Sequence, residues 1–265
     1  MEKIVVISTN NNPDYFFYIP ITTWAWQKLG WKVALFYTHD FNINLLKDHA
    51  LPDYLMQIPQ IEGTRESTQA QTARHFSSNM LPSESYVLLS DIDMIPLSNY
   101  INPELDKKTI WGWDLTGHSY VPVSYIGMPC KDWKELMGCT GNMHRDMETA
   151  MKENGRAYSD DWETYWNTDW DILTKKVQPR KDEFISIDRG MVNLAKDATA
   201  ARRVDRYDMD KTMNQADLID CHAHNHNPSH PIKFEPLLKV LEKAFGAYPD
   251  WFKEYANTHH ILYGQ

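Results

Sequence analysis

The chain has 265 residues, of which 42% are apolar and 24% are charged. A chain of this length can bury one sizeable core, and the composition is that of an ordinary soluble globular protein. The formal net charge of −9 disfavours a protein that binds duplex nucleic acid through its phosphates. Three cysteines are too few and too odd in number for a disulfide framework, which favours a reducing cytoplasm.

The N-terminal residues lead directly into an apolar run, without the basic segment, long apolar stretch and cleavage site of a secretion signal. No stretch approaches the roughly twenty apolar residues that a membrane span requires. We therefore expect a cytoplasmic protein without a membrane-spanning helix. Ten Trp and fourteen Tyr side chains can fill a core, and they can also provide flat surfaces for sugar rings or bases.

Apolar runs and helix signals alternate over the first hundred residues. Strands are expected at 3–8, 31–37, 54–58 and before Asp91. Helices are expected at 15–29, where Gly30 stops the helix, and at 67–80. Strands that alternate with helices indicate a parallel sheet with right-handed crossovers.

The pattern is less regular after Pro96. Further strands are expected at 109–113, 121–126, 184–187 and 218–223. Further helices are expected at 131–136, 145–154, 164–176 and 234–245. No internal repeat, low-complexity run or linker divides the sequence, so we expect a single domain over residues 1–265.

The most informative motif is the apolar run from Tyr86 to Leu89, which is followed by Ser90, Asp91 and Asp93. Acids two residues apart on an extended backbone point to the same side, where they can hold a hard divalent cation. Open α/β sheets bind their ligands at the carboxyl ends of the strands. The pair therefore predicts a metal site that carries a phosphate ester, and a solvated turn is the competing interpretation.

The loop after the first strand contains neither G-x-G-x-x-G nor the glycine-rich P-loop signature. This disfavours a dinucleotide-dependent dehydrogenase and a P-loop enzyme. The same loop is neither glycine-rich nor basic, which also disfavours a nucleotidylyltransferase.

The first strand, its polar loop and the sequence Leu88-Leu89-Ser90-Asp91-Ile92-Asp93 resemble a GT-A-fold, metal-dependent glycosyltransferase that uses a nucleotide sugar. The resemblance covers nearly the whole chain and implies an α/β fold, with a Rossmann-like, mostly parallel central sheet flanked by helices. It implies a nucleotide-binding half at 1–97 and an acceptor-binding half at 98–265. The implied reaction moves a sugar from a nucleotide sugar, with UDP as the expected nucleotide, to a hydroxyl of a carbohydrate or other acceptor.

In this family the acids of the D-x-D motif hold Mn²⁺ or Mg²⁺ against the donor diphosphate, where the ion neutralises the charge on the leaving group. The resemblance makes Asp93 the direct metal ligand, and Asp91 a ligand of the ribose or of a metal-bound water. It places Arg74 where relatives carry a cation that faces the donor; a solvated helix arginine is the alternative. Base and ribose contacts are implied for Thr9, Asn10, Asn12 and Asp40.

Residues 139–143 resemble the family's small-residue strand beneath the donor sugar, which implies donor contacts for Gly141 and Asn142; an ordinary turn glycine is the alternative. Residues 166–173 resemble an acidic element at the start of a family helix. This element supplies the catalytic base in inverting members and contacts the donor sugar in retaining members. Asp169 is the expected base and Asp171 a second catalytic candidate, although acids also favour helix starts for dipole reasons alone.

Late in the chain, Asp220, His222 and His224 would share one face of a strand, and His226 follows. The family often completes its metal site with a late histidine, which implies His222 or His224, with His222 preferred. The same pattern also resembles the first metal motif of amidohydrolase barrels, and so a metal-dependent hydrolase. Only about forty residues follow it, however, where such a barrel needs roughly two hundred.

A non-catalytic carbohydrate-binding protein is the remaining alternative. It would explain the many aromatic residues. It would not explain why Asp91 and Asp93 are paired at the end of a buried strand.

Overall fold

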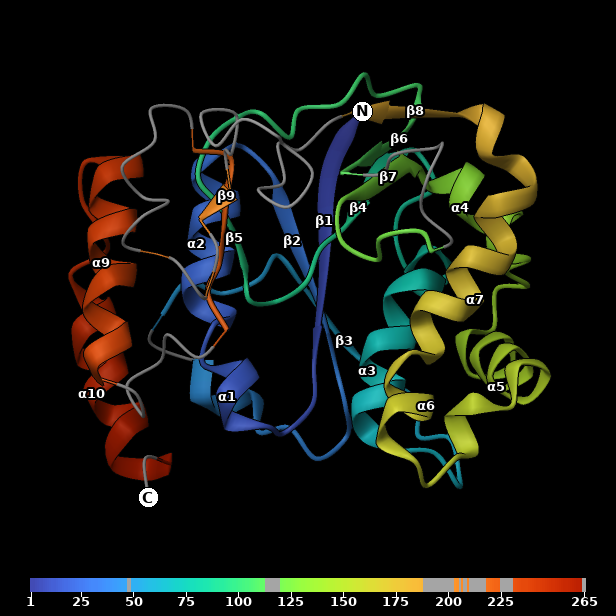
Figure 1. Cartoon of the computed structure of the whole chain (residues 1–265), viewed down its shortest axis with the longest axis horizontal. Coiled ribbons are helices and arrows are strands. Elements are labelled where there is room, and N and C mark those ends of the chain that lie inside the picture. The colour runs from blue at the N-terminus through green and yellow to red at the C-terminus, as the bar shows by residue number, and fades with distance from the viewer. Residues whose placement is uncertain are drawn as a thin grey trace.

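The computed structural model describes residues 1–46, 49–112, 120–187, 203–204, 206, 209, 218–224 and 231–263. A seven-stranded sheet in the order β3-β2-β1-β4-β7-β6-β8 forms its centre, beside a three-stranded sheet in the order β5-β10-β9. Helices α2, α9 and α10 cover one face of the large sheet, and α3, α4, α5 and α7 cover the other (Figure 1). This arrangement confirms the predicted α/β fold.

In the large sheet, as far as the structure describes it, β7 runs opposite to the other six strands. Its strands are β1 (Glu2–Thr9), β2 (Lys32–Tyr37), β3 (Tyr54–Gln57), β4 (Ser85–Leu89), β6 (Lys108–Trp111), β7 (Ile126–Pro129) and β8 (Phe184–Ile187). Strands β1 to β4 are mutually parallel, as the alternating pattern predicted. Strand β7 runs antiparallel to β4, and β6 and β8 continue the sheet beyond it.

The small sheet connects distant parts of the chain. It consists of β5 (Met94–Pro96), β9 (Arg203–Val204) and β10 (Asp220–His222). Strand β10 pairs antiparallel with β5, with His222 opposite Met94, and parallel with β9. The N–H of Ala223 donates to the carbonyl of Asp93 at 2.8 Å. The small sheet thus places β10 directly beside the acidic motif.

All six predicted helices are present, with two of them divided. The helices are α1 (Pro13–Phe16), α2 (Ile19–Lys28), α3 (Glu66–Ala73), α4 (Cys130–Met137), α5 (Met143–Asn154), α6 (Trp162–Trp166), α7 (Thr168–Val177), α9 (Pro231–Phe245) and α10 (Trp251–Tyr263). The segment 15–29 divides because Pro20 stands in the first turn of a new helix. The segment 164–176 divides at Asn167, and 67–80 continues from α3 as a 3-10 helix.

The strand predicted at 121–126 is wrong except for its last residue. Strand β7 begins only at Ile126, because Tyr125 before it has a φ of 61°, which is outside the extended region. Strands β5 and β9 and helix α10 had no sequence prediction. Trp113, at the end of another predicted strand, lies outside the described residues.

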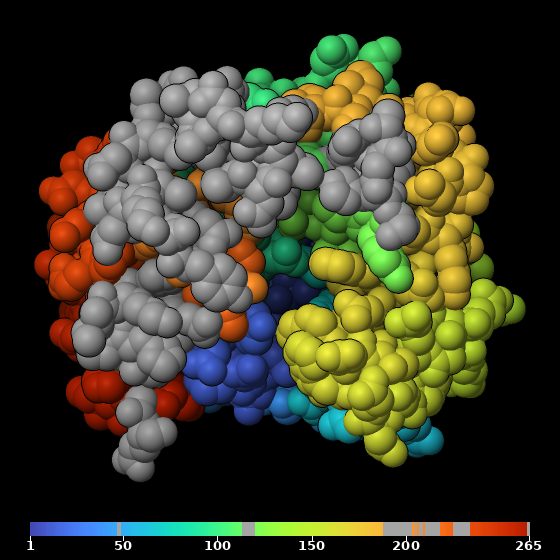
Figure 2. All heavy atoms as spheres, in the orientation of Figure 1, coloured from blue at the N-terminus to red at the C-terminus, as the bar shows by residue number. Residues whose placement is uncertain are grey.

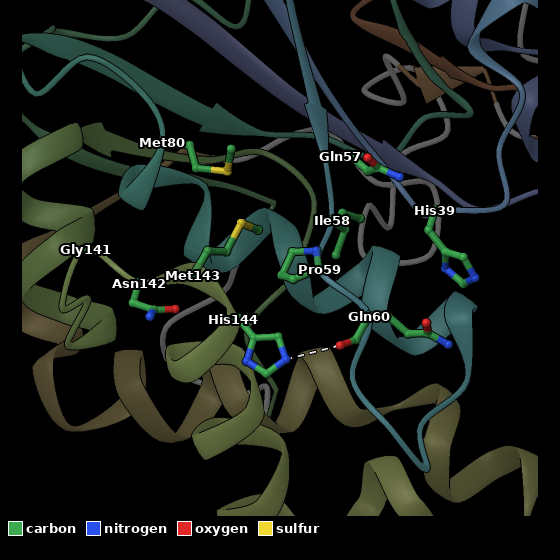
Figure 3. Close-up of a pocket in the computed structure, with 10 residues that line it drawn as sticks. All are labelled: His39, Gln57, Ile58, Pro59, Gln60, Met80, Gly141, Asn142, Met143 and His144. Carbon is green, nitrogen blue, oxygen red and sulfur yellow. Dashed lines mark hydrogen bonds between the residues drawn. The ribbon is translucent and has the colours of Figure 1, made fainter.

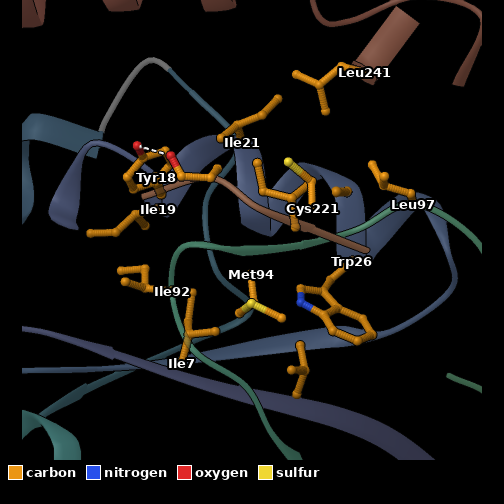
Figure 4. Packing of buried hydrophobic residues seen from close by; sticks show 14 of the residues in the cluster. Ile7, Tyr18, Ile19, Ile21, Trp26, Ile92, Met94, Leu97, Cys221 and Leu241 are labelled. Carbon is orange, nitrogen blue, oxygen red and sulfur yellow. Dashed lines mark hydrogen bonds between the residues drawn. The ribbon is translucent and has the colours of Figure 1, made fainter. Parts of the chain in front are cut away.

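The core holds the acidic motif in place. Alternate residues of β1 point to opposite faces of the sheet, so Ile7 and Val6 belong to two different apolar clusters. Figure 4 shows Ile92 and Met94, which flank Asp93, packed with Ile7 and Trp26. No helix among the described residues is long and apolar enough to cross a membrane.

Candidate functional site

The two acids of the motif lie in a turn between β4 and β5. The N–H of Met94 donates to the carbonyl of Asp91 at 3.2 Å and closes this turn. The prediction that the acids follow the central strand is confirmed, but the prediction that they share one face of an extended strand is wrong. The chain turns because β4 ends at Leu89 and Met94 enters the small sheet. The two carboxylates consequently have different partners.

Asp93 pairs with a histidine from the far end of the chain. Its Oδ2 lies 3.2 Å from Nε2 of His222, and its side chain is only 7% exposed. Burial alone would raise the pKa of Asp93, but the hydrogen bond and charge of His222 outweigh it and lower that pKa. The structure thus brings together two of the predicted metal-ligating residues.

Arg206 contacts both His222 and His224, and Tyr15 contacts His224. The Nη1 of Arg206 lies 3.3 Å from Nε2 of His222 and 3.3 Å from Nδ1 of His224. The ring of Tyr15 on α1 stacks on His224 with 5.0 Å between the centroids. Burial raises the pKa of the Tyr15 hydroxyl to about 12, and the charges of Asp93 and Asp91 act in the same direction. Tyr15 therefore stays protonated as a hydrogen-bond donor. His226 lies outside the described residues.

Asp91 and Asp169 are joined by one arginine. The side chain of Arg74 is 4% exposed and forms an ion pair with Asp91 through Nη1. Its Nη2 lies 3.3 Å from Oδ2 of Asp169, and its Nη1 donates to the carbonyl of Ser90 at 3.0 Å. The alternative of a solvated helix arginine is therefore wrong. Arg74 thus links Asp169, at the start of α7, to Asp91, which follows the end of β4.

Asp169 is a buried acid with an altered acidity. Its N-terminal position on α7 lets it accept from the N–H of Trp170 at 2.8 Å. Burial raises the pKa of Asp169 to about 6, Arg74 opposes this rise, and the charge of Asp91 adds to it. Burial also lowers the pKa of the neighbouring His75 to about 3, so that ring is neutral. An acid that titrates near neutrality is suited to proton transfer.

Asp171 has different surroundings from Asp169. Residues two apart on a helix do not face the same side. The carboxylate of Asp171 accepts from Asn154 at 2.8 Å and forms ion pairs with Arg156 and Lys175. The structure therefore does not bring Asp171 to the Arg74 cluster, and a catalytic role for it stays a prediction.

The polar loop lies at the end of β1, as predicted. The hydroxyl of Thr9, which is buried, donates to the carbonyl of Asn10 at 2.9 Å, and the side chain of Asn12 caps α1. Asp40 follows β2 and accepts from Thr38 at 2.6 Å. Hydrogen bonds within the chain thus order these side chains, and base and ribose contacts for them stay a prediction.

Among the described residues, a group of three metal-ligating side chains within 4.8 Å occurs at His39, Asp40 and Glu66, and not around Asp93. A hydrogen bond to the Asp40 carboxyl raises the pKa of Glu66, with burial acting in the same direction. His39 and Asp40 are exposed. Nothing else in the structure marks this exposed cluster as a cation site.

Gly141 and Asn142 lie in the loop between α4 and α5, so the prediction of a strand here is wrong. Gly141 has a φ of 91°, which explains the glycine, and Asn142 caps α5 by accepting from the N–H of Arg145 at 3.1 Å. Both residues line a shallow groove of about 550 Å³ at the end of β3, with His39 and His144 (Figure 3).

A divalent cation fits part of the predicted set. Asp93 and His222 lie side by side and offer a carboxylate oxygen, which suits Mn²⁺ or Mg²⁺, and an imidazole nitrogen, which suits transition metals. Arg74 binds Oδ1 of Asp91, which leaves Oδ2 as the oxygen that this acid can offer. The single lone pair of Nε2 in His222 can serve either a metal or Arg206.

The hydrolase alternative does not fit the fold. Its barrel would need eight parallel strands in a closed ring, whereas the central sheet is open and mixed. Asp220 is fully buried and its Oδ1 lies 3.8 Å from Nε of Arg203, while His222 pairs with Asp93. Asp220, His222 and His224 therefore do not form one metal site.

Sequence reasoning missed Arg206 and Tyr15. Arg206 belongs to no motif, so no pattern in the sequence marks it. Tyr15 follows the polar loop of β1, and that position at the carboxyl edge of the sheet was the signal available.

No protein-family model and no curated protein matches the sequence. Among solved structures, the chain is similar to the glycosyltransferase GlyE of Streptococcus pneumoniae TIGR4, with 13% identity, 94% of this chain and 65% of that chain covered, and a TM-score of 0.48. For the apo form of GlyE the identity is 12%, the match covers 97% of this chain and 64% of that chain, and the TM-score is 0.49. For the galactosyltransferase LgtC, in complex with donor and acceptor sugar analogs, the identity is 11%, the match covers 95% of this chain and 99% of that chain, and the TM-score is 0.49. The chain thus spans slightly less than two thirds of the GlyE chain.

Proposed function

We propose that this protein is a glycosyltransferase that uses a nucleotide sugar, with UDP as the expected nucleotide, and a divalent cation. The observation that carries the proposal is the convergence of Asp93, His222 and the Asp91–Arg74–Asp169 cluster at the carboxyl end of β4. This edge lies at the carboxyl ends of β1 and β4, where the strand order reverses, the position at which open α/β sheets bind ligands.

The chain's own residues divide the work of this reaction. Asp93 and His222 would hold Mn²⁺ or Mg²⁺, which would neutralise the charge that develops on the leaving diphosphate. Arg74 fixes the orientation of Asp91, which then offers its free oxygen to the ribose or to a water. Tyr15 on α1 provides a protonated hydroxyl that can donate a hydrogen bond.

Asp169 has one of two roles, depending on the stereochemistry. An inverting reaction needs a base within hydrogen-bond reach of the acceptor hydroxyl, and the raised pKa of Asp169 suits that task. In a retaining reaction Asp169 would contact the donor sugar. Proton NMR of the anomeric signal in the first-formed product distinguishes the two outcomes.

Calorimetry with UDP tests the proposal. Binding should require Mn²⁺ and disappear with EDTA in the unmodified protein. Asp93→Asn should lose the Mn²⁺-dependent binding of UDP. Asp171→Asn, which changes an acid of α7 with other partners, should keep it. UDP binding of equal strength with Mn²⁺ and with EDTA would refute the proposal.

A further inference from the structure

Exposed aromatic rings gather on α6, at the start of α7 and at Tyr120. Trp162 is 57% exposed, Trp170 42% and Tyr120 48%. The other tryptophans that the structure describes are partly or fully buried. Tryptophan is highly buried on average, so two rings this exposed on adjacent helices suggest a binding surface.

The rings form two pairs. Trp162 and Trp166, four residues apart on one helix, stack with 5.7 Å between centroids and an angle of 22°. Tyr120 and Trp170 lie 6.2 Å apart at 42°. These four residues are called the aromatic surface below. Each pair includes at least one ring that is more than 40% exposed and so offers ring surface to a ligand.

The aromatic surface adjoins the candidate site. Trp170 follows Asp169 directly in α7, and its backbone N–H donates to that acid, which Arg74 joins to Asp91. Figure 2 shows the molecule hollowed between blue α1 and yellow α6, with dark-blue and green segments at its floor. Helix α1, on the other side of the hollow from α6 (Figure 2), carries Tyr15, which stacks on His224.

The charges nearby favour a neutral ligand. Asp160, Asp161 and Glu163 are exposed beside Trp162. Arg65, 3.8 Å from Asp160, offsets part of their charge, and Asp161 caps α6 by accepting from the N–H of Thr164. Carboxylates accept hydrogen bonds from hydroxyl groups, but they repel the phosphates of a nucleotide or nucleic acid. A sugar ring combines an apolar face that packs on an aromatic ring with hydroxyls that these acids can bind.

We propose that the aromatic surface binds a neutral oligosaccharide as the acceptor of the reaction, with successive sugar rings on the two pairs. This inference rests on the proposed function, because it gives the acceptor of that site a chemical class. The occupant is a glycan rather than the base of the donor, since one base would need only one of the two aromatic pairs.

Neutral oligosaccharides test the inference directly. Cellotetraose, maltotetraose and chitotetraose are titrated against the protein, with tryptophan fluorescence and calorimetry as readouts. At least one should bind, and Trp162→Ala and Trp170→Ala should each weaken it about tenfold, the loss expected for one stacked ring. Ile261→Ala, which removes a 76% exposed apolar residue on α10, is the matched control and should change nothing.

UDP calorimetry with Mn²⁺ on the same variants separates the possible failures. Parental UDP affinity in both tryptophan variants is expected and shows that they are folded. If none of the three oligosaccharides binds, or if the variants lose UDP instead, the aromatic surface is not an acceptor site. If the oligosaccharide binds as expected while UDP binding shows no metal dependence, the proposed function fails and the glycan site stands.

Discussion

Nε2 of His222 lies 3.2 Å from Oδ2 of Asp93, although 129 residues separate them in the chain. Backbone pairing of β10 with β5 creates this contact, because His222 stands opposite Met94 and Ala223 bonds to the carbonyl of Asp93. The hydroxyl of Tyr18 also donates to the carbonyl of Ala223 at 2.5 Å. These backbone bonds do not involve either side chain, so substitutions at Asp93 or His222 should change chemistry more than the fold.

His222→Ala should abolish the metal dependence of UDP binding, because it removes the nitrogen beside Asp93. His224→Ala should weaken UDP binding less and keep the metal dependence, since His224 contacts Arg206 and Tyr15 instead. Calorimetry with and without Mn²⁺ measures both effects. A His222→Ala variant that still requires Mn²⁺ as the parent does would rule out His222 as a ligand.

Arg74→Gln should destabilise the protein by about 3 kcal/mol, because it leaves the buried carboxylate of Asp169 without its charged partner. Urea unfolding at pH 7 measures the change. Adding Asp169→Asn should recover part of the loss, since the unpaired charge is then gone. Strictly additive losses in the double variant would show that the Arg74–Asp169 pair contributes no coupling energy.

The elements that the sequence predicted are those set by local patterns. Strands β1, β2 and β4 follow from apolar runs, and the stop of α2 follows from Gly30, whose φ is 78°. Strand β5 was missed because only three residues pair and their partner is β10, more than a hundred positions later. The turn at Asp91 depends on that same pairing, so no local pattern reveals it.

The site residues follow the same division. Asp91 and Asp93 were singled out by their spacing, and His222 by the resemblance; the structure brings Asp93 and His222 together, and their metal binding stays a prediction. The burial of Arg74 depends on α7 packing over it, which places Asp169 within reach, and a sequence window around Arg74 does not contain that information. Gly141 was misplaced because a glycine at positive φ fits a helix-connecting loop as well as a ligand-facing strand.

Gly127→Ala should destabilise the fold by about 1–3 kcal/mol through overpacking. A Cβ at this position of β7 would lie 2.7 Å from Oη and 2.8 Å from Cε1 of Tyr86, a fully buried ring on β4. Thermal unfolding measures the loss. Tyr86→Leu costs stability by itself, but combined with Gly127→Ala the total should be less than the sum. A Gly127→Ala variant of parental stability would show that the Tyr86 ring can move aside.

Asp169→Asn should change how stability and activity depend on pH. The pKa of Asp169 is raised from 3.8 to about 6, so between these values the folded chain holds a proton that the unfolded chain has released. Stability from this group therefore falls as pH rises from about 4 to about 6, by up to about 3 kcal/mol. The asparagine variant lacks this slope, so its stability relative to the parent should rise over that window and stay level above it.

If Asp169 is the base, the parental rate of UDP release with an acceptor should rise through pH 6. Asp169→Asn should then lower kcat roughly 10²–10⁴-fold with unchanged UDP affinity. Urea unfolding at pH 4.5 and 7.5, with rates over the same range, measures both effects. Parallel stability profiles for the two proteins would show that Asp169 keeps an ordinary pKa and is ionised throughout.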